Sequence, residues 1–168
     1  MHPTSAVDIL HFGSTDWVAC SGPCVITATV EITMTGVDAI ARAMARLQRR
    51  YPTICAFSIT DRQSAGGIDP ECRQGLIDLT RKYTHVLSGT ATVLEGTGFR
   101  ATALRSLVTA IHLASSSSHP AKVFASVQPA LEWLASTQPA GALDISSIAQ
   151  ALATCRAQLK EKSSKREP

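Results

Sequence analysis

The chain has 168 residues, 45% of them hydrophobic, and a formal net charge of +3 at pH 7. A chain of this length suits one domain that buries roughly two thirds of its unfolded surface. No apolar run reaches the ~18–20 residues that a membrane span requires, and the N-terminal residues lack a basic stretch leading into a long apolar core. We therefore expect a cytoplasmic protein without a membrane span.

The net charge comes from the C-terminal end of the chain. Residues 156–168 carry five basic and two acidic side chains, which account for the whole +3. We interpret residues 161–168 as a solvated basic tail. Aromatic residues make up only 5% of the chain, so the stacking platforms that bases require are missing and nucleic acid is not an expected partner.

Five cysteines, an odd number without a secretion signal, argue against a disulfide framework. Cys20 and Cys24 have C-x3-C spacing, but no second Cys or His pair lies at zinc-finger distance. Cys55, Cys72 and Cys155 fall within apolar strand or helix patterns, and we expect them to be small buried hydrophobes. The sequence therefore predicts no metal site.

The first third of the chain alternates between predicted strands and helices. Val7–Phe12 and Trp17–Cys20 are short strands, and Val25–Thr33 is a β-branched strand with period-two alternation. Val37–Tyr51 carries apolar residues spaced 3, 4, 3 and 4 apart, which is one face of an amphipathic helix. Thr53–Thr60 is a nearly continuous apolar run, typical of a central parallel strand covered on both faces.

The alternation continues beyond the loop formed by residues 61–68. The predicted elements are a helix starting after Asp69, the strand Ser88–Leu94, a helix after Gly98, the strand Lys122–Ala125 and the helix Val127–Ala135, which Ser126 caps. Asp69 is the expected N-cap of its helix, with Pro70 in the first turn. Strands separated by helices of this length imply right-handed crossovers and a mostly parallel sheet, to which the N-terminal strands add antiparallel pairs. The predicted fold class is α/β, with helices flanking a mixed sheet.

An extra C-terminal helix follows this domain, which spans residues 1–136. Residues 137–143, which contain the run TQPAG, are the predicted flexible linker, and the helix covers residues 144–160. The apolar residues Ile145, Ile148, Leu152, Cys155 and Leu159 form a narrow stripe along this helix. Such a stripe packs on its own domain, on a second copy or on a partner; we favour its own domain, with a homodimer next.

Two loops make up the candidate binding site. Asp61 and Glu95 each follow a strand, and α/β folds bind ligands at the carboxyl ends of parallel strands. The candidate binding residues are Asp61, Arg62, Ser64, Gly66, Gly67, Glu95, Thr97 and Arg100. Two carboxylates at one edge could act as acid and base, but strand-end acids more often pair with neighbouring arginines. No nucleophile or metal ligand accompanies them, so we expect no enzyme.

A dinucleotide site is a weaker possibility. Gly96, Gly98 and Ala101 fit the G-x-G-x-x-A form of the dinucleotide fingerprint. The acidic residue that would bind a ribose hydroxyl about twenty positions later is missing. A tight strand-to-helix turn explains the two glycines equally well, and the sequence therefore predicts no cofactor.

Two segments resemble the SpoIIAA-like STAS/SEC14 family of small bacterial domains. They are residues 95–105, EGTGFRATALR, and residues 122–134, KVFASVQPALEWL. Domains of this family often end with a strand reading like KVF and a helix ending in A-x-x-W-L. The order of elements from Val25 to Leu134 also suits the family. The resemblance implies a STAS-like mixed sheet and a regulatory or ligand-binding role rather than catalysis.

The chain departs from the family at the stretch where a phosphorylation site would be expected. STAS anti-anti-sigma proteins carry a D-S-S-G-like motif at the start of the helix after the third strand. The corresponding stretch here, residues 60–69, contains Ser64 and two glycines but not this motif. Phosphorylation of Ser64 therefore stays open.

Together these patterns lead to three functional hypotheses. The first is a non-catalytic regulatory module that binds another protein or its own copy. The alternative is a domain that binds a small apolar or anionic ligand at the sheet edge, and an enzyme of unknown reaction comes third. A buried pocket at the sheet edge would favour the ligand binder, whereas a flat exposed apolar face would favour the interaction module.

Overall fold

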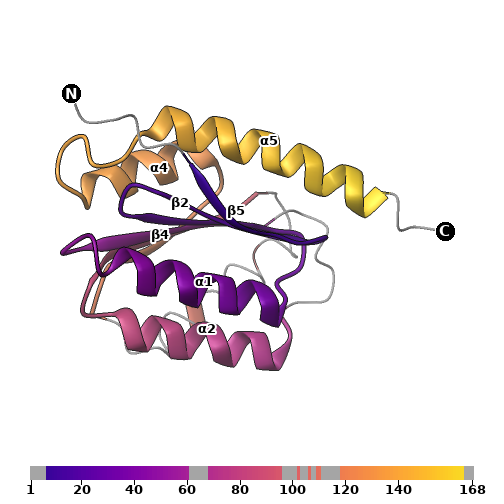
Figure 1. Ribbon diagram of the computed structural model, residues 1–168, viewed down its shortest axis with the longest axis horizontal. Helices are drawn as coiled ribbons and strands as arrows, with labels where there is room; N and C mark the ends of the chain where they lie inside the picture. The colour runs from indigo at the N-terminus through magenta and orange to yellow at the C-terminus, as the bar shows by residue number, and fades with distance from the viewer. Residues whose placement is uncertain are drawn as a thin grey trace.

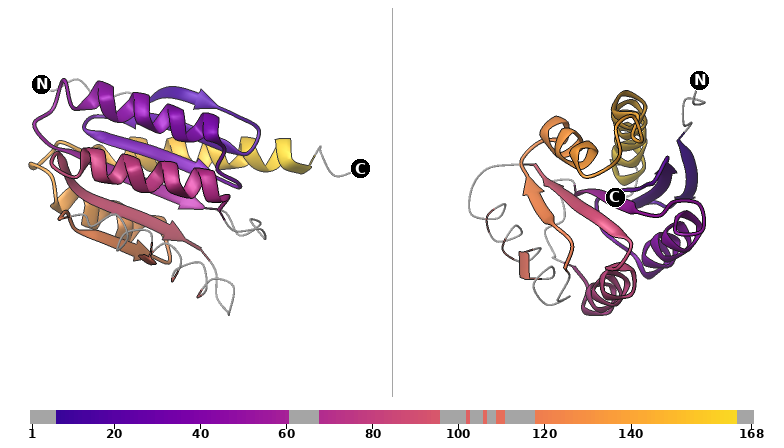
Figure 2. Two further views of the ribbon diagram at one scale, coloured as in Figure 1. Left: turned by 90° about the horizontal axis from the view of Figure 1, so that it is seen from below. Right: turned by 90° about the vertical axis from the view of Figure 1, so that its left-hand side faces the viewer.

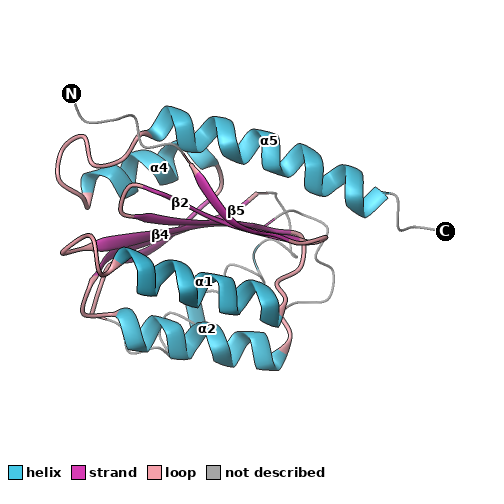
Figure 3. Ribbon diagram, viewed as in Figure 1, coloured by secondary structure: helices cyan, strands magenta, loops and turns pink. Residues whose placement is uncertain are grey.

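The elements that the structure describes with both ends form three layers, with one sheet between two pairs of helices (Figure 1, Figure 3). The computed structural model describes residues 7–60, 68–95 and 118–164, together with residues 102, 106, 109 and 110. Helices α1 (Met34–Leu47) and α2 (Pro70–Tyr83) lie on one face of the sheet. Helices α4 (Val127–Ser136) and α5 (Ile145–Ser164) lie on the other. The helix predicted after Gly98 falls largely outside the described residues.

Six strands form the sheet, in the order in which they occur in the chain. They are β1 (Asp8–Phe12), β2 (Asp16–Ser21), β3 (Cys24–Thr29), β4 (Ile54–Thr60), β5 (Leu87–Leu94) and β6 (Ala121–Phe124). Strands β1, β2 and β3 pair antiparallel, and strands β3 to β6 pair parallel. The predicted α/β class, with a mixed and mostly parallel sheet, is confirmed.

A tight turn joins β2 to β3. Ser21 pairs with Cys24 across the turn, and Gly22 between them has a φ of 54°. Glycine adopts this left-handed conformation without the steric cost that other residues meet. The turn therefore sets the register in which Val18 faces Thr27 across the two strands.

The start of α1 differs from its predicted position. β3 ends at Thr29 and α1 begins at Met34, so the predicted strand to Thr33 is too long and the predicted helix start at Val37 is too late. Thr33 is the N-cap, since its side chain accepts a hydrogen bond from the Gly36 backbone N–H at 3.1 Å. Its own hydroxyl donates to Asp16 Oδ2 at 2.6 Å. Because Asp16 comes from β2, a tertiary contact fixes this helix boundary.

The N-caps of α2 and α4 lie at the positions predicted from the sequence. Asp69 caps α2 as predicted, and its Oδ1 accepts a hydrogen bond from the Glu71 N–H at 2.9 Å. Ser126 occupies the N-cap of α4 as predicted, but its side chain makes no capping hydrogen bond. α5 begins at Ile145 and runs to Ser164, past the predicted end at residue 160.

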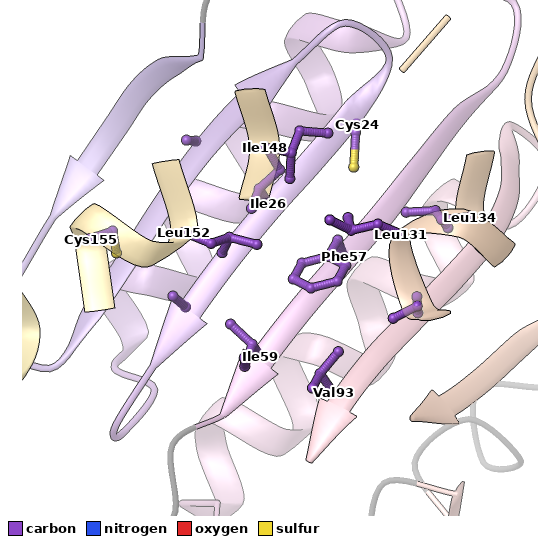
Figure 4. Packing of buried hydrophobic residues seen from close by; sticks show 14 of the residues in the cluster. Cys24, Ile26, Phe57, Ile59, Val93, Leu131, Leu134, Ile148, Leu152 and Cys155 are labelled. Carbon is purple, nitrogen blue, oxygen red and sulfur yellow. The ribbon is translucent and has the colours of Figure 1, made fainter. Parts of the chain in front are cut away.

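Helices α4 and α5 bury their apolar residues against one face of the sheet (Figure 4). On α5, Ile148, Leu152, Cys155 and Leu159 are each at most 3% exposed, and Ile145 packs at the margin of this cluster. The apolar stripe therefore packs on its own domain, which is the arrangement favoured from the sequence. Ile148, Leu152 and Leu159, which were candidates for an interaction surface, are instead part of the core.

The segment between α4 and α5 is more than a flexible linker. Thr137 Oγ1 lies 3.3 Å from Ser88 Oγ of β5, and the Gln138 amide donates to the same Ser88 oxygen. Gln138 is 9% exposed. These bonds tie the start of the predicted linker to strand β5.

Within the described part of the chain, no helix combines the length and apolar character needed to cross a membrane.

Candidate functional site

The two faces of the central strands are chemically different. Toward α4 and α5, strands β3, β4 and β5 present mainly apolar side chains, and Ser88, which bonds Thr137 and Gln138 near the end of α4, is the polar exception. We call the apolar set the apolar face: Cys24, Ile26, Ala28, Cys55, Phe57, Ile59, Ala91 and Val93. Toward α1 and α2, the same strands present six hydroxyl groups, which we call the hydroxyl face: Thr27, Thr29, Ser58, Thr60, Thr90 and Thr92. Period-two alternation along each strand separates the two sets.

The hydroxyl groups are aligned across the strands. Thr27 of β3 pairs in register with Ser58 of β4, which pairs with Thr92 of β5, so three hydroxyls form one row. One row toward the carboxyl ends of the strands, Thr29 pairs with Thr60. A sheet buried on both faces normally carries near-continuous apolar residues, and these rows are therefore an exception that needs a reason.

Hydrogen bonds within the rows are few. Ser58 Oγ donates to Thr92 Oγ1 at 3.1 Å. Thr29 Oγ1 and Thr60 Oγ1 lie 3.4 Å apart, at the long limit for a hydrogen bond. The hydroxyls therefore satisfy one another only in part. Thr27 Oγ1 also donates to the Phe57 carbonyl at 3.4 Å, and Thr90 Oγ1 lies 2.9 Å from His119 Nε2.

A cavity of about 160 Å³ lies over the hydroxyl face, beneath α1 and α2. Its apolar lining comes from the sheet and from both helices and includes Val25, Ile40, Met44, Ala56, Leu76 and Leu87. The exposed Glu31, just after β3, also lines it. The cavity thus combines apolar walls with a hydroxyl floor, which is the usual make-up of a small-molecule site.

Loose packing of α2 leaves room for this cavity. Only Cys72 and Tyr83 of α2 are fully buried, whereas Leu76 and Thr80 are half-buried and line the cavity. α2 instead lies against α1 (Figure 2), where a Cβ added at Gly75 would lie 2.9 Å from Val37 Cγ1. α2 therefore packs closely on α1 and leaves space between itself and the sheet.

Of the eight binding residues predicted from the sequence, one is described. Glu95 accepts hydrogen bonds from both terminal nitrogens of Arg156 on α5, with Nη1 and Oε1 3.2 Å apart. Its carboxylate is therefore held by Arg156 of α5. Asp61, Arg62, Ser64, Gly66, Gly67, Thr97 and Arg100 lie outside the described residues.

A buried carboxylate that the sequence did not single out joins β2 to α1. Asp16, which is 1% exposed, lies 2.8 Å from His11 Nε2 and accepts hydrogen bonds from the backbone N–H and hydroxyl of Thr33. An added Cβ at Gly36 would lie 2.2 Å from Asp16 Oδ2, so only glycine fits there. Because both of its oxygens have hydrogen-bond partners, Asp16 links β1, β2 and the start of α1.

Three of the cysteines are poor nucleophiles, because their thiols stay protonated. All five are buried and free of disulfides, so the expected burial of Cys55, Cys72 and Cys155 is confirmed. Burial raises the pKa of the Cys20 and Cys155 thiols to about 12. A hydrogen bond with Cys55, together with burial, raises the pKa of Cys24 well above its ordinary value. These thiols stay protonated near neutral pH, and the thiolate is the reactive form.

Metal ligands do not cluster in the part of the chain that the structure describes. No three His, Cys, Asp or Glu side chains gather there in a way that could hold an ion.

Sequence reasoning missed the hydroxyl rows, although a signal was present. In residues 25–29, 56–60 and 90–94, two Ser or Thr residues stand two positions apart and alternate with apolar residues. The β propensity of Thr is enough to explain its presence in any single strand. The hydroxyl rows become visible only when the strands are aligned in register.

Comparison of the chain with protein-family models, with curated proteins and with solved structures finds no match. The resemblance to the SpoIIAA-like STAS/SEC14 family therefore stays a prediction.

Proposed function

We propose that this protein is a non-catalytic domain that binds a small, mainly apolar molecule in the cavity between the hydroxyl face and helices α1 and α2. The observation that carries the proposal is the contrast between the two sides of one sheet. The apolar face is closed by α4 and α5, whereas the hydroxyl face borders a cavity of about 160 Å³. An apolar cavity of about 150 Å³ is large enough to bind benzene, so this one admits a ring-sized ligand.

The position of the cavity supports the same function. Thr29, Thr60 and Leu94 are the last residues of their strands, and all three line the cavity. Ligand sites in open α/β sheets lie at the carboxyl ends of the strands. A pocket at this edge was the feature expected to separate a ligand binder from an interaction module.

The regulatory interaction module implied by the family resemblance remains a prediction. Among the described residues, Ile9 on the edge strand β1 is the one large apolar side chain that is exposed, at 58%. A flat apolar patch would need several such neighbours. The structure therefore gives the ligand-binding proposal the stronger support.

Ligand binding is tested with a ring-sized probe and a variant that fills the cavity. Toluene binding to the native chain is measured by ligand-observed NMR, and we expect saturable binding. Ala56→Leu places a larger side chain in the cavity and should abolish binding, whereas Ala153→Leu, on the exposed side of α5, should not affect it. Equal toluene binding by the native chain and Ala56→Leu would contradict the proposal, and so would a native chain that does not bind.

A further inference from the structure

We propose that the cavity selects neutral molecules with one oxygen acceptor on an otherwise apolar body, and that the Thr92 hydroxyl binds this oxygen. This inference rests on the proposed function, because it names the chemical class of ligand for the same cavity. It narrows the choice between apolar and anionic ligands that the sequence left open.

The first observation is an unused donor on strand β5. Thr92 is 6% exposed, and its Oγ1 accepts the hydrogen bond from Ser58. A hydroxyl has one proton to donate as well as lone pairs to accept with. When Ser58 donates, the Thr92 proton has no acceptor among the described residues. A buried donor without a partner destabilises the structure, and an oxygen of a ligand would supply the missing acceptor.

The second observation is how polar and apolar groups are ordered along the strands. Val25 and Ala56 occupy the row that precedes Thr27, Ser58 and Thr92, and Thr90, whose hydroxyl lies 2.9 Å from His119 Nε2, completes that row on β5. Met44 of α1 lines the same cavity. A ligand whose oxygen reaches Thr92 can therefore lay its apolar part against Val25, Ala56 and Met44. This arrangement fits an amphipathic molecule better than a pure hydrocarbon.

The third observation concerns charge. The row that would receive the polar group of the ligand contains only neutral hydroxyls, and a buried anion without a positive partner is strongly destabilised by its lost hydration. The one charged side chain among the described lining residues is Glu31, which is negative and repels anions. Neutral ligands are therefore favoured over their anionic analogues.

Three probes of similar size separate these properties. The native chain is titrated with toluene, benzyl alcohol and benzoate, and NMR shifts of the protein report each affinity. We expect benzyl alcohol to bind most tightly, toluene next and benzoate most weakly. Thr92→Val keeps the shape of the side chain but removes its hydroxyl. It should lower the affinity for benzyl alcohol roughly fivefold, the effect of one neutral hydrogen bond, and leave that for toluene unchanged.

Two further variants control for changes in packing. Thr92→Ser retains a hydroxyl and should keep the preference for benzyl alcohol over toluene. Thr154→Val makes the same Thr-to-Val change on the exposed surface of α5 and should leave all three affinities unchanged.

Each outcome has a definite meaning. If benzoate binds most tightly, or if Thr92→Val retains the full preference for benzyl alcohol, the inference about ligand class is overturned while the binding function stands. If none of the three probes binds the native chain, the proposed function itself fails.

Discussion

The two sides of the central sheet come from the same three strands, yet they are built for different purposes. On the apolar face, residues such as Phe57 and Ala91 are at most 1% exposed and pack under α4 and α5. On the hydroxyl face, Ala56 and Ser58 are only half-buried and border a cavity. Successive residues of one strand therefore alternate between the packed core and the wall of the cavity.

This difference shows how a small domain can hold a cavity and remain folded. Removing apolar contacts from one side of a sheet lowers the hydrophobic contribution to stability. The other side must then be well packed, and α5 adds a long buried stripe there. The packing of the C-terminal helix therefore offsets the apolar contacts that the cavity removes.

The largest expected effect comes from deleting α5. A chain that ends at Thr137 loses Ile148, Leu152 and Leu159 from the core, and each large buried aliphatic side chain contributes roughly 1.5–3 kcal/mol. We expect the truncated chain to lose its cooperative thermal unfolding, measured by circular dichroism. A chain ending at Ser164 retains the whole helix and should melt like the full chain. An unchanged melting temperature after truncation at Thr137 would show that α5 contributes little to the core.

A smaller effect is expected when the same substitution is made on each face. Ala91 is 0% exposed on the apolar face, so Ala91→Leu overpacks the core and should lower the free energy of unfolding by about 1–3 kcal/mol. Ala56 lines the cavity, where a leucine side chain finds space. Ala56→Leu should therefore lower the free energy of unfolding much less than Ala91→Leu does, or should even raise it.

Chemical denaturation of both leucine variants measures the difference. Equal losses of stability would mean that the two faces are packed alike, which contradicts the comparison.

The smallest effect is expected at the start of α5. Asp144 Oδ1 accepts a hydrogen bond from the Ser147 backbone N–H at 3.0 Å, and this bond is the main reason that the pKa of Asp144 is lowered. A carboxyl group whose pKa is lower in the folded state stabilises the protein above its unfolded pKa. That contribution is lost as the pH falls through the folded pKa.

Asp144→Asn keeps a capping side chain but does not titrate. We expect the native chain to lose stability relative to this variant as the pH is lowered from 5 toward the folded pKa, measured by thermal melts at each pH. A difference in melting temperature that does not change with pH would show that the Ser147 contacts do not favour the charged form.

Much of the fold could be predicted from the sequence. Strands such as Thr53–Thr60 and the cap at Asp69 depend on local patterns, and the structure places them within a residue or two. The start of α1 could not be predicted, because Thr33 is fixed by Asp16 of another strand. Local preference alone made the β-branched run to Thr33 resemble a longer strand.

The site was harder to predict than the fold. The sequence pointed to charged residues at strand ends, yet Glu95 is held by Arg156, which lies 61 positions further along the chain. The hydroxyl rows depend on the register of β3, β4 and β5, and a single strand does not reveal that register. A cavity also depends on how far α2 stands from the sheet, which no local pattern encodes.

Xenon binding tests the central claim most directly, because xenon enters apolar cavities without needing any specific ligand. Methyl NMR spectra of the native chain are recorded under increasing xenon pressure. We predict shifts for methyl groups that line the cavity, at Val25, Met44 and Ala56, and none for Ala91, Leu131 and Leu134, which pack between α4 and the sheet. Equal shifts in both sets, or shifts confined to the second set, would contradict the account of one closed face and one face that holds a ligand site.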